Sequence, residues 1–250
     1  MADSSSSGAR IALVTGGAKR VGRAIVERLA AEGFDVAFTY NTSGGEADAL
    51  AGQLRQRGRR AVAIRADLFD PAAGVAAIFN EFSRHFPGGR LDVLVNSASA
   101  YLPARLRETD LELIRRLNAI HLEAPLLLCQ RFEPLLRAAR GHVVNMVDLL
   151  AERPWPQYLA YAASKAALVA LTVGLARELA PECTANGIAP GVVEWPPDYP
   201  EAEREKYLKR VPLGRAGTPQ DVANLVHFLA TGGAYINGQI IRLDGGRSVT

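Results

Sequence analysis

Residues 11–22 read Ile-Ala-Leu-Val-Thr-Gly-Gly-Ala-Lys-Arg-Val-Gly, and this stretch decides the fold class. Its first five residues are apolar or β-branched, which is typical of a short buried strand. The glycines that follow allow a sharp turn, and apolar residues then recur at helical spacing from Val21 through Ile25 to Leu29. A strand, a glycine-rich turn and a helix in this order predict the first unit of a dinucleotide-binding α/β fold.

The rest of the chain repeats the alternation of strand and helix. We expect strands at 11–15, 36–40, 61–65, 91–95, 142–147, 184–188 and 239–243, and helices at 20–32, 46–57, 71–85, 158–180 and 220–230, with one or two helices within 111–136. Such alternation predicts a Rossmann-like, doubly wound parallel sheet with helices on both faces. We expect a flexible tail at 1–9 and one domain at 10–250.

Composition excludes several classes of function. Basic residues are scattered among acids and the net charge is only +3, so we expect no nucleic-acid partner. We find no apolar run near the roughly 18 residues of a membrane span, and no signal-peptide pattern. Cys129 and Cys183 are too few for a disulfide framework or a metal site, so we expect free thiols, no metal and a cytoplasmic location.

The glycine-rich turn indicates a cofactor with phosphate groups. The first turn of the helix that follows offers unpaired N–H groups and a partial positive charge to a pyrophosphate. The second strand ends in Tyr40-Asn41-Thr42-Ser43, without the acid that dinucleotide folds preferring NAD place there. Hydroxyls, an amide, Lys19 and Arg20 favour a 2′-phosphate, so we predict NADP(H), although a polar turn with no such role is the alternative.

Tyr161 and Lys165 form the candidate catalytic pair. Their spacing places both on one face of the helix expected at 158–180. An ammonium one turn from a phenol is expected to lower the phenol pKa and so make it a useful acid or base. Lysine occurs only four times in this arginine-rich chain, and Lys19 and Lys165 both lie in candidate motifs.

Asp148 follows the strand expected at 142–147. It is expected near the start of the Tyr161 helix, where a carboxylate would orient Tyr161 or share its proton. A turn or helix-cap aspartate is the alternative. The segment at about 194–212, rich in proline and charge, is either a substrate lid or a plain surface excursion.

Together these features resemble the short-chain dehydrogenase/reductase family over nearly the whole chain. The family's glycine loop matches residues 15–22, its Asn-Asn-Ala-Gly matches Asn96-Ser97-Ala98-Ser99, and its Tyr-x-x-x-Lys pair matches Tyr161 and Lys165. Pro190-Gly191 and Asp244-Gly245-Gly246 match the turn after the sixth strand and the C-terminal signature. The helix asparagine of the family is assigned to Asn118.

Three departures from the family pattern are similar to pteridine reductases. Arg20 replaces a loop glycine, Ser99 replaces another glycine, and Asp148 stands where most members have a catalytic serine. The stretch Asn145-Met146-Val147-Asp148 and the twelve residues between Asp148 and Tyr161 also match that subgroup. The resemblance therefore implies reduction of a dihydropterin, a biopterin or dihydrofolate by NADPH.

By this resemblance the site residues take three roles. Catalysis is assigned to Asp148, Tyr161, Lys165 and Asn118. The cofactor is assigned to Gly16, Lys19, Arg20, Val21, Gly22, Tyr40, Asn41, Thr42, Ser43, Asp67, Leu68, Asn96, Ser97, Ala98, Lys165, Pro190 and Gly191. The substrate is assigned to Arg20, Ser99, Tyr101, Asp148, Tyr161, Val192, Trp195 and Tyr207, with Tyr101 stacking on the pterin ring.

Two other functions remain open. One is NADPH-dependent reduction of a carbonyl, such as a 3-oxoacyl thioester, against which Arg20, Ser99 and Asp148 argue. The other is a non-catalytic NADP(H)-binding sensor, which would more naturally lack Tyr161 or Lys165. The resemblance also implies a homotetramer built on the helices at 111–136 and 158–180, whose apolar residues core burial explains equally well.

Overall fold

The computed structural model describes residues 8–195 and 198–250, and its core is one parallel sheet of seven strands. The strand order is β3-β2-β1-β4-β5-β6-β7, and every neighbouring pair is parallel. The strands are β1 (Ile11–Val14), β2 (Asp35–Tyr40), β3 (Ala61–Arg65), β4 (Val93–Asn96), β5 (His142–Met146), β6 (Thr184–Pro190) and β7 (Ile240–Leu243). The Rossmann-like fold predicted from the sequence is confirmed.

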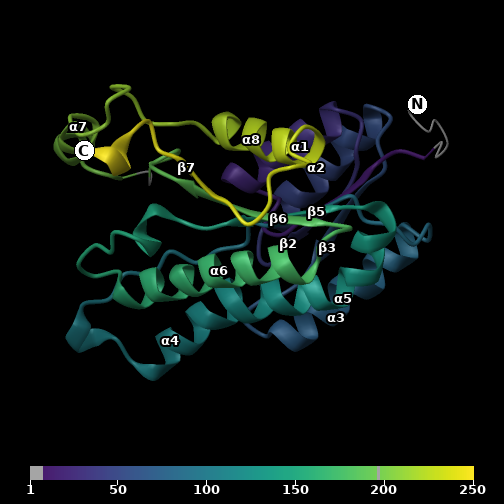
Figure 1. Ribbon diagram of the computed structural model, residues 1–250, viewed down its shortest axis with the longest axis horizontal. Helices are drawn as coiled ribbons and strands as arrows, with labels where there is room; N and C mark the ends of the chain where they lie inside the picture. Colours follow the sequence, from purple (N-terminus) through teal and green to yellow (C-terminus); the bar gives the residue numbers. More distant parts are fainter. Residues whose placement is uncertain (1–7, 196–197) are drawn as a thin grey trace.

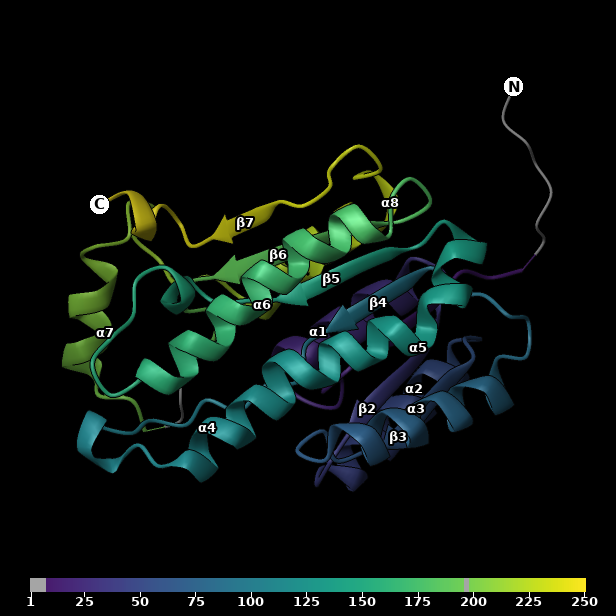
Figure 2. The same ribbon diagram turned by 60° about the horizontal axis from the view of Figure 1, so that its bottom comes forward.

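Helices cover both faces of the sheet (Figures 1 and 2). One face carries α1 (Arg20–Ala31), α2 (Gly44–Gln56) and α8 (Pro219–Thr231). The other carries α3 (Pro71–His85), α5 (Ala124–Ala139) and α6 (Leu159–Glu178), with α4 (Leu111–Asn118) leading into α5. Short 3₁₀ turns lie at Leu106–Glu108, Leu149–Ala151 and Arg247–Val249.

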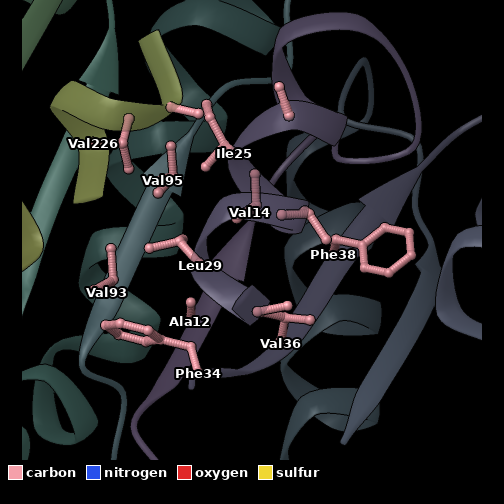
Figure 3. Packing of buried hydrophobic residues seen from close by; sticks show 14 of the residues in the cluster. Ala12, Val14, Ile25, Leu29, Phe34, Val36, Phe38, Val93, Val95 and Val226 are labelled. Atoms are coloured by element: carbon pink, nitrogen blue, oxygen red, sulfur yellow. The ribbon is translucent and has the colours of Figure 1, made fainter. Parts of the chain in front are cut away.

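The buried core explains the order of the layers. In Figure 3, Ile25 and Leu29 of α1 pack over Val14 of β1 and Val95 of β4, beside Val226 of α8. All five side chains are fully buried. Because both faces are covered, the inner strands are apolar at nearly every position rather than alternating.

Several predicted boundaries were wrong in detail. The segment expected as one or two helices at 111–136 consists of α4, one π-helical turn at Ala119–Glu123, and α5. The supposed lid contains the helix α7 (Glu201–Leu208), which the sequence analysis did not predict because its charged residues have little helical periodicity. Residues 1–7 of the expected tail and residues 196–197 of the lid fall outside the described residues.

The helix α6 is long and apolar enough to pass a length-and-composition test for a membrane span. Its mean hydropathy is 1.6 and 44% of the tested window is buried, so the expectation that no such stretch exists was too strong. In this fold α6 covers the sheet beside β6, and its inner face carries the buried Tyr161 and Lys165. Core helices commonly pass this test, so the finding is weak support for a membrane role.

Candidate active site

The glycine loop between β1 and α1 is packed too closely for side chains. Gly16 has a φ of +66°, and a Cβ there would lie 2.9 Å from the Cα of Ala98 after β4. A Cβ on Gly22 would lie 2.1 Å from the carbonyl oxygen of Gly16. The loop therefore folds onto itself and onto the carboxyl end of β4, at the point where the strand order reverses.

The first turn of α1 can accept an anion. Lys19, the residue before the helix, makes no side-chain cap, and the first turn contains no acid. The N–H groups of this turn are thus left for a ligand, and the helix dipole favours negative charge there. The predicted residues Val21 and Gly22 lie in this turn and Gly16 lies in the loop before it, an arrangement that fits the pyrophosphate of a dinucleotide.

Two threonine hydroxyls that the sequence analysis did not single out hold the loop in place. Thr15 Oγ1 accepts hydrogen bonds from the backbone N–H groups of Ser97 and Ala98, both at 2.9 Å. Thr39 Oγ1 accepts one from Gly16 N–H at 3.0 Å. The sequence feature that could have identified both residues was a threonine near the carboxyl end of an apolar strand.

The predicted cofactor residues after β2 and β3 lie together. Two polar side chains assigned to the cofactor, Lys19 of the glycine loop and Asn41 after β2, are already paired within the protein. Lys19 forms a 2.7 Å ion pair with Glu46 in the first turn of α2. The side-chain amide of Asn41 donates to Asp67 Oδ1 at 3.2 Å. Tyr40, Thr42 and Ser43 end β2 or precede α2, and Leu68 is buried. An acidic residue, Glu46, therefore does lie near the end of β2, and Lys19 neutralises its charge.

Asn96 faces the interior rather than the cofactor edge. Its side-chain amide donates to Asn145 Oδ1 at 2.8 Å, and Asn145 in turn donates to Thr172 Oγ1 at 2.9 Å. Asn96 is only 4% exposed. Asn96 therefore links β4 to β5, while the backbone of Ser97 and Ala98 contacts the start of the glycine loop.

Asp148 and Tyr161 are joined by a direct hydrogen bond. The Tyr161 hydroxyl donates to Asp148 Oδ2 at 2.8 Å, across the gap between the end of β5 and the start of α6. Asp148 Oδ1 accepts from the N–H of Leu150 at 2.8 Å, which caps the 3₁₀ turn. The Asp148 carboxyl group therefore both contacts the Tyr161 hydroxyl and caps the turn, two positions that the sequence analysis treated as alternatives.

Lys165 lies one helical turn from Tyr161, and a backbone carbonyl group at the end of β5 holds its side chain. Its Nζ donates to the carbonyl oxygen of Met146 at 2.8 Å and lies 5.8 Å from the centre of the Tyr161 ring. Burial lowers the Lys165 pKa to about 8, although the charge of Asp148 acts in the opposite direction. The ammonium is therefore held close to its point of deprotonation.

The pKa of Tyr161 does not follow the expectation. Burial, and then the nearby charge of Asp148, raise it well above its usual value, and Lys165 is not among the groups that lower it. Burial also raises the pKa of Asp148. The prediction of a lowered tyrosine pKa was wrong, because it counted the ammonium but not burial or the carboxylate. Both groups are instead biased toward their protonated forms.

Aromatic rings form one wall beside this centre. The Tyr101 ring stacks on Tyr158, with centroids 4.4 Å apart, and meets the Tyr161 ring edge-on at 4.9 Å. Tyr101 is 45% exposed, so part of it faces outward. Tyr158, at the start of α6, was not predicted, although its spacing of three from Tyr161 would have pointed to it.

The predicted lid residues meet on the loop after β6. The Tyr207 hydroxyl accepts from the N–H of Val192 at 3.0 Å, and the Tyr207 ring packs edge-on against Trp195 at 5.4 Å. A Cβ on Gly191 would lie 3.0 Å from the same hydroxyl, which explains the glycine after Pro190. Arg20 of the glycine loop reaches this segment through a 2.8 Å ion pair with Glu194.

Asn118 and Ser99 are placed differently. Asn118 ends α4 and is half-buried, and within the described chain no hydrogen bond joins its side chain to Asp148, Tyr161 or Lys165. Ser99 is exposed beside the centre and lies 2.9 Å from a nitrogen of His121. His121 was missed by the sequence analysis, although a single histidine within an apolar stretch was a usable signal.

Comparison with known proteins agrees with this geometry. Residues 16–248 match the family described as Enoyl-(Acyl carrier protein) reductase, designated adh_short_C2. The chain is 35% identical to pteridine reductase 1 of Leishmania tarentolae, covering 97% of each chain. It is also 35% identical to the 3-oxoacyl-(acyl-carrier-protein) reductase of Staphylococcus aureus, covering 94% of this chain and 96% of the relative.

Solved structures give the same result. A blue fluorescent protein from a metagenomic library, crystallised with NADPH, superposes with a TM-score of 0.87 at 37% identity, covering 96% of this chain and 98% of that one. A short-chain dehydrogenase/reductase from Serratia marcescens gives 0.88 at 35% identity, with the same coverage. The chain therefore belongs to the short-chain dehydrogenase/reductase family of NAD(P)-dependent oxidoreductases.

Proposed function

We propose that this protein is an NADPH-dependent pteridine reductase, acting on a dihydropterin, a biopterin or dihydrofolate. The observation that carries the proposal is the partly buried Asp148 carboxyl hydrogen-bonded to the Tyr161 hydroxyl. A carboxyl group suits a substrate that is reduced at a C=N bond, because a basic ring nitrogen needs a proton as the neighbouring carbon is reduced. Ser99 and Arg20 are assigned to the pterin and the cofactor phosphates.

NADP(H) is the cofactor. The open first turn of α1 and the closely packed glycines fit a dinucleotide, and the similar metagenomic protein was crystallised with NADPH. When bound, the nicotinamide supplies the hydride. Gly16, Val21 and Gly22 would hold the pyrophosphate, and the polar residues 40–43 after β2 would face the adenosine ribose.

The chain's own groups can deliver the proton without a change of position. Tyr161 is the proposed donor, and once it has given up its proton a protonated Asp148 returns one to it through their 2.8 Å hydrogen bond. The carboxylate left on Asp148 is stabilised by the Lys165 ammonium, whose charge favours that form. Burial raises the pKa of both acids and so favours their protonated forms.

Carbonyl reduction is the second candidate. Its support is the equal identity to the Staphylococcus aureus 3-oxoacyl reductase. Against it stands Asp148 itself, since a ketone oxygen needs only a hydroxyl donor and the carboxyl group raises the pKa of Tyr161. A non-catalytic sensor is disfavoured by the ordered Asp148–Tyr161 pair.

The test is NADPH oxidation followed in the nicotinamide absorption band. Dihydrobiopterin, dihydrofolate and an acetoacetyl thioester are compared, with NADH as the cofactor control. We expect turnover of a pterin with NADPH. Turnover of the thioester alone would replace the proposal with carbonyl reduction, and cofactor binding without any turnover would support the sensor.

We further infer a homotetramer built on α5 and α6. The support is the outer face of α6, where Leu159, Ala163, Ala166, Ala170 and Val173 are exposed. Ala170→Arg should dissociate the assembly in light scattering coupled to gel filtration, whereas Ala72→Arg on exposed α3 should not. A cytoplasmic location is also inferred, supported by the buried free thiols of Cys129 and Cys183.

A further inference from the structure

His121 is a buried polar group beside the candidate catalytic centre for which the mechanism has no role. It lies in the π-helical turn between α4 and α5 and is 1% exposed. Its ring meets the Tyr161 ring edge-on at 5.4 Å. Both ring nitrogens lie at hydrogen-bond distance from hydroxyl groups, Nε2 from Ser99 at 2.9 Å and Nδ1 from Ser164 at 2.9 Å.

The neighbours of His121 determine which nitrogen carries the proton. Ser164 Oγ lies 2.7 Å from the carbonyl oxygen of Tyr161, which can only accept, so the Ser164 proton points there. His121 Nδ1 must then donate to Ser164 Oγ. The N–H of Ala100 points at His121 Nε2 at 3.3 Å, which requires that nitrogen to be unprotonated. Two independent contacts thus give the same tautomer.

This tautomer fixes the hydroxyl of Ser99. Because Nε2 has no proton and can only accept, Ser99 is the donor in their 2.9 Å contact, and the lone pairs of Ser99 Oγ point away from His121. Ser99 is exposed, in contrast to His121 and Ser164, so those lone pairs are accessible to a bound molecule. The Ser99 hydroxyl also faces the Tyr161 hydroxyl, which directs its own proton to Asp148 Oδ2.

The network does not conduct protons. Its far end is the carbonyl oxygen of Tyr161, which lies inside the helix and has no proton to pass on. The groups facing His121 are Ser99, Ser164, Tyr161 and the Lys165 ammonium. Burial, and then the charge of Lys165, lower the pKa of His121 to about 2, so the ring stays neutral at working pH.

We propose that His121 is a positioning residue that holds Ser99 as an obligatory hydrogen-bond acceptor, so that the site selects ring substrates presenting N–H donors. This proposal rests on the proposed pterin function for its substrate class, since an aminopyrimidine ring carries such donors and a thioester ketone does not. His121, three residues after Asn118, thus contacts the centre from the region in which the sequence analysis placed a catalytic residue at Asn118.

The first test is independent of the substrate. Imidazole ¹⁵N–¹H correlation spectra of the labelled protein report the tautomer of each of the four histidines, and His121→Gln assigns the signal of His121. We expect a neutral ring protonated on Nδ1 throughout pH 5 to 8. A ring protonated on Nε2, or one that titrates in this range, would overturn the proposal even if pterins are the substrates.

The second test uses a matched pair of variants. His121→Gln retains an acceptor near the position of Nε2, whereas His121→Asn retains a donor near Nδ1 but cannot reach Ser99. We expect His121→Asn to raise KM for dihydrobiopterin about tenfold with kcat nearly unchanged, and His121→Gln to restore most of the loss. The shape of the pH profile should be the same in both.

A substrate control separates this proposal from the proposed function. The preference for a dihydropterin over its 2-oxo analogue, which lacks the amino donor, should fall in His121→Asn and in Ser99→Ala by a similar factor. If the wild type reduces only a thioester, the pterin function fails, and the tautomer measurement still decides the role of His121. Equal kinetics for the asparagine and glutamine variants would overturn that role.

Discussion

The candidate catalytic centre and the candidate lid, residues 194–212, differ in how their polar groups are paired. In the centre, Asp148, Tyr161 and Lys165 are each held by short hydrogen bonds to buried or partly buried groups. In the candidate lid, Glu194 forms an ion pair with Arg20 of the glycine loop, and the two side chains are 37% and 60% exposed. Buried hydrogen bonds fix geometry and shift pKa values, while an exposed pair is screened by water and contributes about 0–1 kcal/mol.

This difference indicates which region is suited to the chemical step and which to ligand binding. The centre is built on strand ends and a core helix, so its groups have little freedom. The candidate lid carries Tyr207 on a short charged helix and Trp195 on the loop before it, and Tyr207 is attached through a single hydrogen bond to Val192. Substitutions in the centre should therefore change rates and pH dependence, and those in the lid should change affinity by small factors.

Removal of the Tyr161 hydroxyl should have the largest effect. Tyr161→Phe keeps the buried ring but removes the proton donor, and we expect kcat to fall by about 10²- to 10⁴-fold. NADPH binding, measured by its fluorescence, should remain nearly intact. Tyr158→Phe is the matched control, because it removes a neighbouring hydroxyl while the ring stays; activity close to wild type in Tyr161→Phe would contradict the donor role.

Replacement of Asp148 tests the substrate class. Asp148→Ser restores the hydroxyl that most family members carry, and we expect pterin reduction to fall by about 10²-fold, more than any carbonyl reduction. The measurement is kcat/KM for both substrate types with the same enzyme preparation. Equal losses on both would mean that the carboxyl group only shapes the turn at Leu149–Ala151.

The pH profile should have an alkaline limb set by Lys165. Because burial lowers the pKa of Lys165 to about 8, the ammonium is lost as the pH rises through that value, and activity should fall with it. The charge of Asp148 raises the Lys165 pKa, so Asp148→Asn should move the limb to lower pH in whatever activity remains. A limb that stays in place would show that another group controls it.

Asp148 should cost stability at neutral pH. Its pKa is raised in the folded protein, so both states are protonated below the pKa of the unfolded chain, and stability is lost as the pH rises through the folded value. Asp148→Asn removes this cost, and we expect its Tm to exceed that of the wild type by a few degrees at pH 8. Calorimetry at pH 4 should show a smaller difference, and the reverse trend would contradict a raised pKa.

The smallest effect is expected in the lid. Glu194→Gln frees Arg20 for the cofactor phosphates or the pterin, and we expect KM for NADPH or the substrate to fall by no more than about threefold. Glu203→Gln is the control, since Glu203 pairs with Lys206 on the exposed side of α7. A large loss of activity in Glu194→Gln alone would show that this ion pair orders the site.

Much of the candidate site could be predicted because the sequence patterns that indicate it are local. The turn at 15–22 contains glycines that no side chain could replace, and the spacing of Tyr161 and Lys165 is one helical turn. Asp148 was placed near Tyr161 because parallel strands end at the same edge of a sheet. The predicted lid residues Val192, Trp195 and Tyr207 also lie together. Each of these inferences needs only neighbouring residues and a sheet direction.

The remaining features depend on contacts between distant segments. Arg20 meets Glu194, and His121 links Ser99 to Ser164, through packing that no spacing in the chain reveals. The direction of the Tyr161 pKa shift was wrong for the same reason, because burial is a property of the assembled core. The sequence by itself therefore determined the fold class and the glycine-rich turn and indicated the candidate reacting groups, since these follow from periodicity and side-chain chemistry. Only the tertiary structure decided the direction of the pKa shifts and which distant side chains meet, because burial and long-range hydrogen bonds set both.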